Sequence, residues 1–182
     1  MKNIPNILSA FRLLLVPLFS IVFFSGLSNA KFWAAGIFLL AGATDVLDGY
    51  IARKYQWITP LGRMLDPLAD KLMQMTVLVT LAVAGLLPIW FCALYFIKEL
   101  FMFLGGLRLY KKMADVIPAN RYGKIAVVFF HLVILAVIFF DAQLAAWKTL
   151  LLLFSLLLMA VAFTGYIRDY LRTLREIKSK TT

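Results

Sequence analysis

The sequence has 182 residues, of which 63% are hydrophobic, and its mean hydropathy is +0.90. Soluble domains are about 45–50% apolar, so this composition excludes an ordinary soluble protein. The apolar runs are continuous rather than alternating, which excludes a transmembrane β-barrel. The formal charge is +10. Because the basic residues cluster beside apolar runs, anionic lipid headgroups and phosphorylated substrates suit them better than nucleic acid.

Six apolar segments follow one another, each close to the roughly 20 residues that a membrane-spanning helix requires. They cover residues 13–27, 32–50, 66–87, 89–109, 125–140 and 149–167. We expect Pro5 to interrupt the chain before the first span, where Ser9 could cap the helix, and Pro67 to lie in the first turn of the third span. Gly85 and Pro88 predict a short turn after that span, and the basic tail, 168–182, is expected to extend the last helix.

The first segment has an alternative interpretation as a cleaved signal peptide. The small residues Ser28-Asn29-Ala30 follow it and could form a cleavage site. Arg12 adjoins the apolar core of this segment, and cleavage of the segment would change the direction in which every later span crosses the membrane. Both points favour a first span that stays attached.

The basic residues are distributed unevenly between the two sides of such a bundle. Sixteen of the nineteen lie in the N-terminal segment, the loops after the second and fourth spans, the span ends beside these loops, and the tail; only Lys31, Lys98 and Lys148 lie elsewhere. Because loops rich in Lys and Arg remain in the cytoplasm, we expect both termini to face it. The sequence therefore predicts an all-α integral membrane protein with six transmembrane helices, in one domain covering 1–182 and located in the cytoplasmic (inner) membrane.

Four of the nine carboxylates lie between residues 45 and 70. Asp45 and Asp48 are spaced i,i+3 in the last turns of the second span, and Asp66 and Asp70 are spaced i,i+4 where the third begins, so each pair is expected on one helix face. Two helix ends with two carboxylates each form an oxygen-rich pocket typical of hard divalent cations. The alternative is a solvated loop whose acids pair with neighbouring bases, namely Arg53, Lys54, Arg63 and Lys71.

The residues around these aspartates follow one continuous pattern, D-x2-D-G-x2-A-R-x8-G-x3-D-x3-D. Its eight positions are Asp45, Asp48, Gly49, Ala52, Arg53, Gly62, Asp66 and Asp70. This pattern resembles the signature of the CDP-alcohol phosphotransferase family, and all eight positions match at the family's spacing. The six-span layout, with the pattern across the second and third spans, is also similar to that family.

The resemblance implies a reaction and a set of site residues. A CDP-linked donor would bind through its pyrophosphate to two divalent cations, Mg²⁺ or Mn²⁺, and an alcohol would attack phosphorus while CMP leaves. The implied metal ligands are Asp45, Asp48, Asp66 and Asp70. Asp70 would also be the general base, because a base beside a metal activates a weak nucleophile. The implied CDP-binding residues are Asp48, Gly49, Ala52, Arg53 and Gly62. A homodimer is implied as well.

The acceptor alcohol is indicated by a second resemblance. The start of the chain, residues 3–9 with Arg12 and Pro17, is similar to the branch of the family that transfers the phosphatidyl group of CDP-diacylglycerol to glycerol 3-phosphate. A phosphorylated acceptor needs cations near Asp70, and Gly123-Lys124 resembles the start of that branch's fifth span. The candidate acceptor-phosphate residues are Lys124, Arg121 and Arg108.

Two departures from that branch leave other acceptors open. Lys98-Glu99 stands where Arg-Glu is usual, and 125–127 replaces a Lys-Thr. Transfer to phosphatidylglycerol, as in cardiolipin synthesis, is the main alternative, with inositol phosphate or serine behind it. Neighbouring helix residues point about 100° apart, so we expect Lys98 and Glu99 to contact other spans rather than each other. A transporter is the remaining class, but its charges would lie near the membrane midplane, often in repeated halves.

Overall fold

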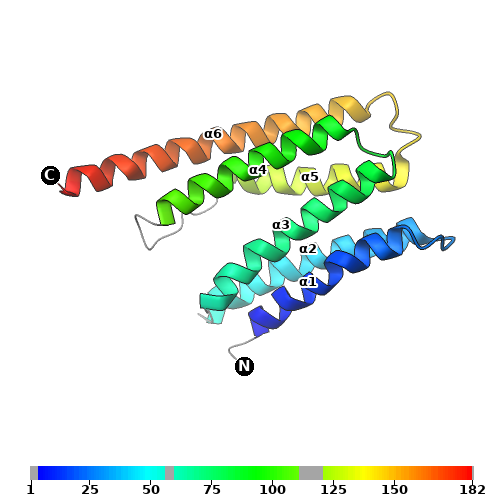
Figure 1. Ribbon diagram of the computed structural model, residues 1–182, viewed down its shortest axis with the longest axis horizontal. Helices are drawn as coiled ribbons and strands as arrows, with labels where there is room; N and C mark the ends of the chain where they lie inside the picture. Colours follow the sequence, from blue (N-terminus) through cyan, green and yellow to red (C-terminus); the bar gives the residue numbers. More distant parts are fainter. Residues whose placement is uncertain (1–3, 56–59, 111–120, 182) are drawn as a thin grey trace. The chain divides into compact units, whose positions relative to one another are not determined.

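The computed structural model describes residues 4–55, 60–110 and 121–181, and all regular structure in this part is helical (Figure 1). The helices are α1 (Ile4–Phe23), α2 (Ala30–Tyr55), α3 (Pro60–Val83), α4 (Ile89–Tyr110), α5 (Arg121–Phe140) and α6 (Lys148–Thr181). They form two compact units, Met1–Leu87 with α1 to α3 and Pro88–Thr182 with α4 to α6. The predicted all-α class is confirmed.

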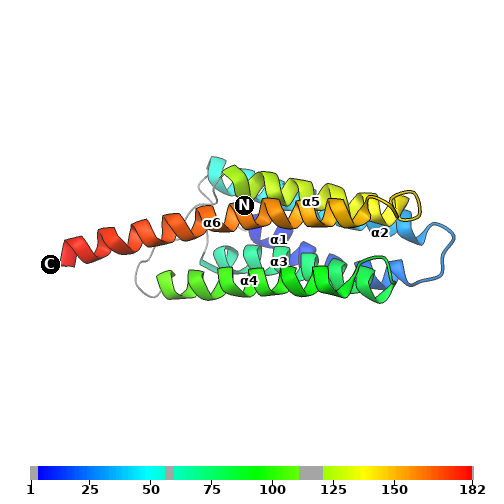
Figure 2. The same ribbon diagram turned by 90° about the horizontal axis from the view of Figure 1, so that it is seen from above.

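In the first unit, α1 packs along both α2 and α3, whereas α2 and α3 contact each other over a much shorter stretch (Figures 1 and 2). Small side chains line the buried faces, including Ala35 of α2 and Ala69 of α3. The ring of Phe19 in α1 meets that of Phe38 in α2 edge to face, with centroids 6.4 Å apart. On the other side of α1, Ser20 and Thr80 share a hydrogen bond of 2.7 Å. As a result, α1 lies between the two helices that carry the aspartates.

The predicted turn at the end of α3 is confirmed and has a defined cap. The amide of Leu86 donates to the carbonyl of Leu81, and that of Gly85 donates to Ala82, at 2.9 and 3.0 Å. These two bonds form a Schellman motif, which requires a left-handed residue after the helix. Gly85 takes this conformation with φ of 73°. A side chain here would strain the backbone.

Several predicted helix boundaries were wrong. α1 begins at Ile4 rather than after Pro5. Proline suits a first helical turn, because the backbone N–H that it lacks would have no acceptor within the helix there. Ser9 is buried within this helix and does not cap it. α3 begins at Pro60, so Pro67 lies inside the helix and not in its first turn. α2 continues to Tyr55, beyond the predicted end at residue 50, so Asp48 lies about two turns and Asp45 about three turns before its end.

In the second unit, α5 packs along α6, and α4 contacts α6 as well. Aromatic rings join these helices: Phe129 meets Phe154, and Tyr95 stacks on Phe130, each pair with centroids 5.1 Å apart. The Tyr95–Phe130 pair is buried between α4 and α5, and aromatic pairs are worth about 0.5–1.5 kcal/mol beyond their area. α6 continues to Thr181, so the expected helical tail is confirmed.

Among the described residues, three helical segments are long and apolar enough to cross a membrane: Asn6–Phe23, Ala30–Ala52 and Lys148–Gly165. The Ile125–Phe140 segment of α5 is apolar but shorter. α3 carries Asp66, Asp70 and Lys71, and α4 carries Lys98 and Glu99. The three apolar helices indicate a membrane-bound protein. Because α3 and α4 carry these charges, the total of six spans stays a prediction.

Candidate active site

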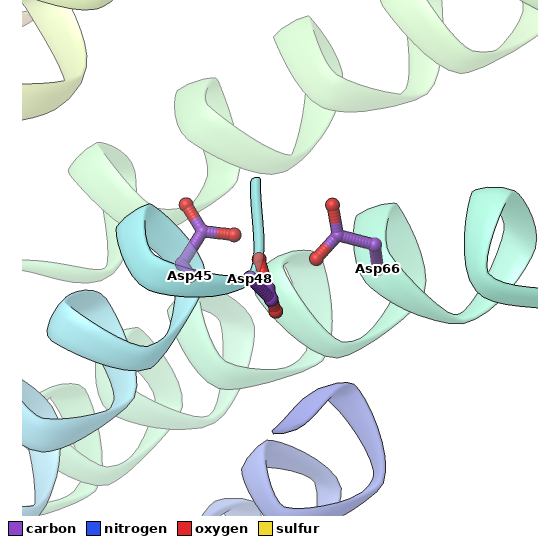
Figure 3. Close-up of side chains that lie close together, drawn as sticks. All are labelled: Asp45, Asp48 and Asp66. Atoms are coloured by element: carbon purple, nitrogen blue, oxygen red, sulfur yellow. The ribbon is translucent and has the colours of Figure 1, made fainter. Parts of the chain in front are cut away.

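Three of the four predicted aspartates form one cluster. Asp45 and Asp48 lie one turn apart on α2, and Asp66 faces them from α3 (Figure 3). One carboxylate oxygen from each lies within 4.8 Å of the others. The Asp48 side chain is 2% exposed, whereas those of Asp45 and Asp66 are 42% and 41% exposed. The cluster thus has a buried end and an accessible end.

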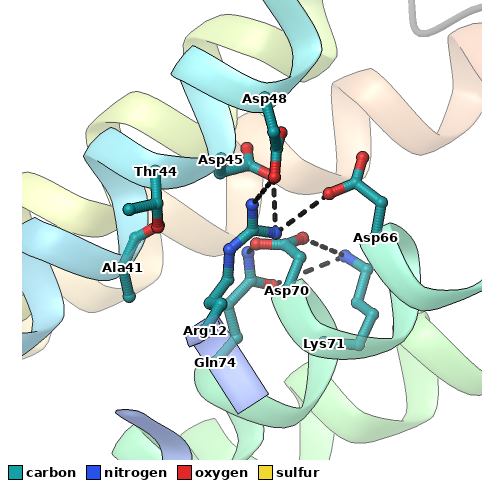
Figure 4. A network of polar contacts seen from close by, with 9 residues as sticks. All are labelled: Arg12, Ala41, Thr44, Asp45, Asp48, Asp66, Asp70, Lys71 and Gln74. Carbon is teal, nitrogen blue, oxygen red and sulfur yellow. Dashed lines mark hydrogen bonds and ion pairs between the residues drawn. The ribbon is translucent and has the colours of Figure 1, made fainter. Parts of the chain in front are cut away.

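The guanidinium of Arg12 from α1 contacts all three carboxylates (Figure 4). Its Nη2 donates to Asp48 Oδ2 at 2.5 Å, and its Nη1 lies 2.8 Å from Asp45 Oδ1 and 3.1 Å from Asp66 Oδ1. Arg12 is only 1% exposed. An arginine within an apolar span costs about 2.5–3.5 kcal/mol on insertion scales, which these anionic partners offset. The position of α1 between α2 and α3 makes this contact possible.

The cluster suits a hard divalent cation. Its donors are all carboxylate oxygens, the ligands that Mg²⁺ and similar cations prefer. Asp48 Oδ1 is buried and has no hydrogen-bond partner among the described residues. Buried polar atoms are nearly always satisfied in folded proteins, so such an oxygen is available to a ligand. Asp45, Asp48 and Asp66 could therefore hold a metal ion.

Asp70 lies one turn beyond Asp66 on α3 and outside this cluster of three. Gln74 Nε2 donates to its Oδ1 at 3.0 Å, and Lys71 Nζ lies 3.9 Å from its Oδ2 (Figure 4). Lys71 Nζ also donates to Gln74 Oε1 at 3.4 Å. Gln74 is 2% exposed and therefore fixed by packing, so its amide orients the carboxylate of Asp70.

The remaining predicted residues are placed less completely. Gly49 and Ala52 continue α2 beyond the first aspartate pair, and Gly62 lies in the first turn of α3. Arg108 lies in the last turn of α4, and Arg121 and Lys124 in the first turn of α5. The side chains of these three bases and of Arg53 lie outside the described residues. Their roles stay predictions.

The expectation that Lys98 and Glu99 do not pair with each other was wrong. Lys98 Nζ lies 2.5 Å from Glu99 Oε1, and it also lies over the ring of Tyr95, 5.1 Å from its centroid. The four methylenes of lysine let its ammonium reach around the helix despite the 100° between neighbouring positions. Glu99 is 5% exposed, so this is a buried pair within α4.

Sequence reasoning missed two residues of the site. Arg12 was noted for its place beside an apolar core and not as a partner of the aspartates. The available signal was its charge, since a charged residue in an apolar span needs a partner. Gln74 gave a weaker signal, as a polar residue one helical turn after Asp70 on the same face. Of the bases proposed as alternative partners of the acids, Lys71 does reach Asp70.

Comparison with known proteins agrees with this geometry. The CDP-alcohol phosphatidyltransferase family model matches residues 2–166. A protein of Rickettsia typhi named CDP-diacylglycerol–glycerol-3-phosphate 3-phosphatidyltransferase is 36% identical over 126 residues, which cover 69% of this chain and 70% of the relative. A Bacillus subtilis protein of the same name is 34% identical over 138 residues, 69% of this chain and 70% of its own length. This chain therefore belongs to the CDP-alcohol phosphatidyltransferase family, as its aspartate pattern indicated.

Proposed function

We propose that this protein transfers the phosphatidyl group of CDP-diacylglycerol to glycerol 3-phosphate and releases CMP. The observation that carries the proposal is the gathering of Asp45, Asp48 and Asp66 from two helices into one cluster. The family match over 2–166 and the names of the Rickettsia and Bacillus relatives support the donor and the acceptor. The enzyme thus serves phospholipid biosynthesis.

In the proposed reaction, the acceptor hydroxyl oxygen attacks the phosphorus that bears diacylglycerol. The bond from that phosphorus to the bridging oxygen breaks, and the oxygen leaves with CMP. Asp70 takes the hydroxyl proton, and Gln74 holds its carboxylate in place. Two divalent cations, Mg²⁺ or Mn²⁺, held by the four aspartates, would neutralise charge on the pyrophosphate.

The proposed CDP site uses residues from both parts of the motif, and the proposed acceptor residues come from outside it. Asp48, Gly49 and Ala52 of α2 leave a face with short side chains, where a nucleotide can approach the backbone. Gly62 and the charge of Arg53 complete the proposed CDP site. For the acceptor, Lys124, Arg121 and Arg108 supply positive charge for the phosphate of glycerol 3-phosphate.

We further propose that the chain is one domain with six membrane spans and acts as a homodimer. Both termini and the acidic hairpin face the cytoplasm, because sixteen of nineteen bases then lie on that side. This orientation puts the active site at the inner surface of the cell membrane, where water-soluble glycerol 3-phosphate can reach it. Its partners are the two substrates and the surrounding lipid, and not nucleic acid.

The test measures CMP release by purified protein in detergent with Mg²⁺ and CDP-diacylglycerol. The acceptors are glycerol 3-phosphate, phosphatidylglycerol, inositol phosphate and serine, each supplied alone. We expect release with glycerol 3-phosphate only. Release with phosphatidylglycerol but not glycerol 3-phosphate would instead establish cardiolipin-type synthesis and overturn the proposed acceptor.

The proposed base is tested with Asp70→Asn, which keeps the shape of the side chain but cannot accept the proton. We expect CMP release to fall by about 10²–10⁴-fold with little change in the melting temperature. Asp141→Asn is the matched control, because it makes the same chemical change in the α5–α6 turn. An unchanged rate in Asp70→Asn would contradict the assignment.

A further inference from the structure

We propose that Arg12 is an internal counter-ion of the metal site, which binds the metal-ligand carboxylates in the metal-free protein and competes with the divalent cation for them. The inference rests on the proposed metal site and adds a residue outside the aspartate pattern. It explains why a fully buried guanidinium lies among the aspartates of two other helices rather than at a membrane surface.

The first step is the identity of the atoms involved. The three aspartates that Arg12 contacts are the same three whose oxygens lie within 4.8 Å of one another. One nitrogen, Nη1, bridges α2 and α3 by contacting Asp45 Oδ1 and Asp66 Oδ1. The other, Nη2, contacts Asp48 Oδ2. A planar fork suits this task, because it presents several donors in fixed directions.

The second step is the charge balance. Three ionised aspartates and one guanidinium carry a formal charge of −2, which one divalent cation would neutralise. Without Arg12, three carboxylates this close would repel one another and separate. With Arg12 present they stay together, but a bound cation meets a positive charge a few ångströms away. Arg12 therefore stabilises the empty site and weakens cation binding at the same time.

The third step separates this role from that of a simple structural crosslink. A crosslink would make metal binding weaker when removed, because the carboxylates would lose their alignment. A competing counter-ion would make binding tighter when removed, because repulsion disappears. Asp48 Oδ1, which is buried and has no hydrogen-bond partner among the described residues, is a carboxylate oxygen that Arg12 does not occupy and that a cation could use as a ligand.

The decisive variant is Arg12→Met, which keeps a flexible, unbranched apolar side chain and removes the guanidinium with its charge. In detergent with EDTA, we expect its melting temperature to fall by roughly 6–12 °C. The reason is that three buried or half-buried carboxylates lose the positive charge of the guanidinium while no metal ion replaces it. Mn²⁺ should raise its melting temperature more than that of the unaltered protein. Mn²⁺ affinity, titrated by electron paramagnetic resonance without substrate, should be tighter by about tenfold or more. Equal or weaker affinity in Arg12→Met would overturn the inference.

Further variants keep the test conclusive if Arg12→Met folds poorly. Folding of Arg12→Met with Mn²⁺ but not with EDTA would support the inference. Arg12→Lys keeps the charge and loses the fork, so its melting temperature in EDTA should fall while its Mn²⁺ affinity stays within about threefold of the unaltered protein. A tenfold tighter affinity in Arg12→Lys would contradict competition by charge. In Arg12→Met/Asp48→Asn, the loss of one carboxylate should recover part of the melting temperature in EDTA.

The matched control is Arg168→Met, which removes an exposed arginine from α6. It should leave the melting temperature, the Mn²⁺ affinity and CMP release unchanged. CMP release by the unaltered protein tests the proposed reaction, whereas these binding and melting measurements use no substrate. If the unaltered protein released no CMP but Arg12→Met bound Mn²⁺ more tightly, the proposed reaction would be refuted. The proposed role of Arg12 as a counter-ion would still be supported.

Discussion

Both helical units place charged side chains inside apolar helices, and they neutralise them in different ways. In the first unit, Arg12 meets partners 36 and 54 residues away in the sequence, from two other helices. In the second unit, Lys98 pairs with its immediate neighbour, Glu99, on the same helix. The long-range network needs three helices to be packed before it exists, whereas the neighbour pair needs one. The difference shows that the Arg12 network depends on the packing of three helices, whereas the Lys98–Glu99 contact can form within a single helix.

The largest expected difference between the two networks concerns catalysis. Asp66→Asn removes one anionic ligand from the cluster, which is worth several kcal/mol to a metal-assisted reaction. We expect CMP release to fall by about 10³-fold, while the melting temperature changes little because the side chain is 41% exposed. A rate within threefold of the unaltered enzyme would remove Asp66 from the site.

The second prediction concerns stability in α4. Lys98→Met leaves Glu99 buried beside an uncharged side chain, and breaking a buried pair in this way costs about 3–5 kcal/mol. Because Lys98 is 20% exposed, we expect the lower value, a loss of about 6–12 °C in melting temperature.

The double variant Lys98→Met/Glu99→Gln is the control for that experiment, and it should regain most of the loss because neither charge remains. If the double variant were stable but its KM for glycerol 3-phosphate rose tenfold, the pair would belong to the acceptor site. The contrast between the two units would then disappear.

A smaller effect is expected at Gln74. Gln74→Leu keeps the volume and removes the donor to Asp70 Oδ1, so the carboxylate loses its fixed orientation. We expect kcat to fall about tenfold, equivalent to 1.4 kcal/mol, with an unchanged KM for CDP-diacylglycerol. Gln143→Leu, at an exposed position in the α5–α6 turn, is the matched control. An unchanged kcat would show that Asp70 needs no support from Gln74.

The smallest effect is expected at the pair between Lys148 and Asp141, whose atoms lie 2.7 Å apart at the start of α6. Both side chains are partly exposed, and such pairs contribute at most about 1 kcal/mol. Lys148→Met should therefore lower the melting temperature by no more than about 4 °C and leave CMP release unchanged. A larger loss would mean that this exposed pair contributes as much to stability as a buried one.

The aspartate cluster could be predicted because its information is local. Spacings of three and four residues place Asp45 with Asp48 and Asp66 with Asp70 on single helix faces. A short connection then brings α2 and α3 together, so Asp66 reaches the first pair. Arg12 could not be assigned in the same way, because its contacts depend on α1 lying between α2 and α3. No spacing within α1 encodes that arrangement.

The errors in the helix boundaries have a similar cause. Pro5 was interpreted as a break before the first helix, yet α1 begins one residue before it. Pro67 was assigned to a first helical turn, yet α3 begins at another proline, Pro60. Proline is compatible with the first turn of a helix, but when several prolines are present this preference does not show which of them begins the helix. The pairing of Lys98 with Glu99 was missed because backbone direction was considered and side-chain length was not.

The position of α1 between α2 and α3 also bears on how the protein enters the membrane. Ribosomes make α1 before α2 and α3, so Arg12 exists before Asp45, Asp48 and Asp66 have been synthesised. During that interval an arginine in hydrocarbon has no anionic partner, which disfavours lateral release of α1 by itself. We therefore expect α1 to wait beside the translocation machinery until α3 has emerged, so that the three helices partition into lipid as one unit. Truncated chains ending before and after α3 would reveal this in a membrane-integration assay.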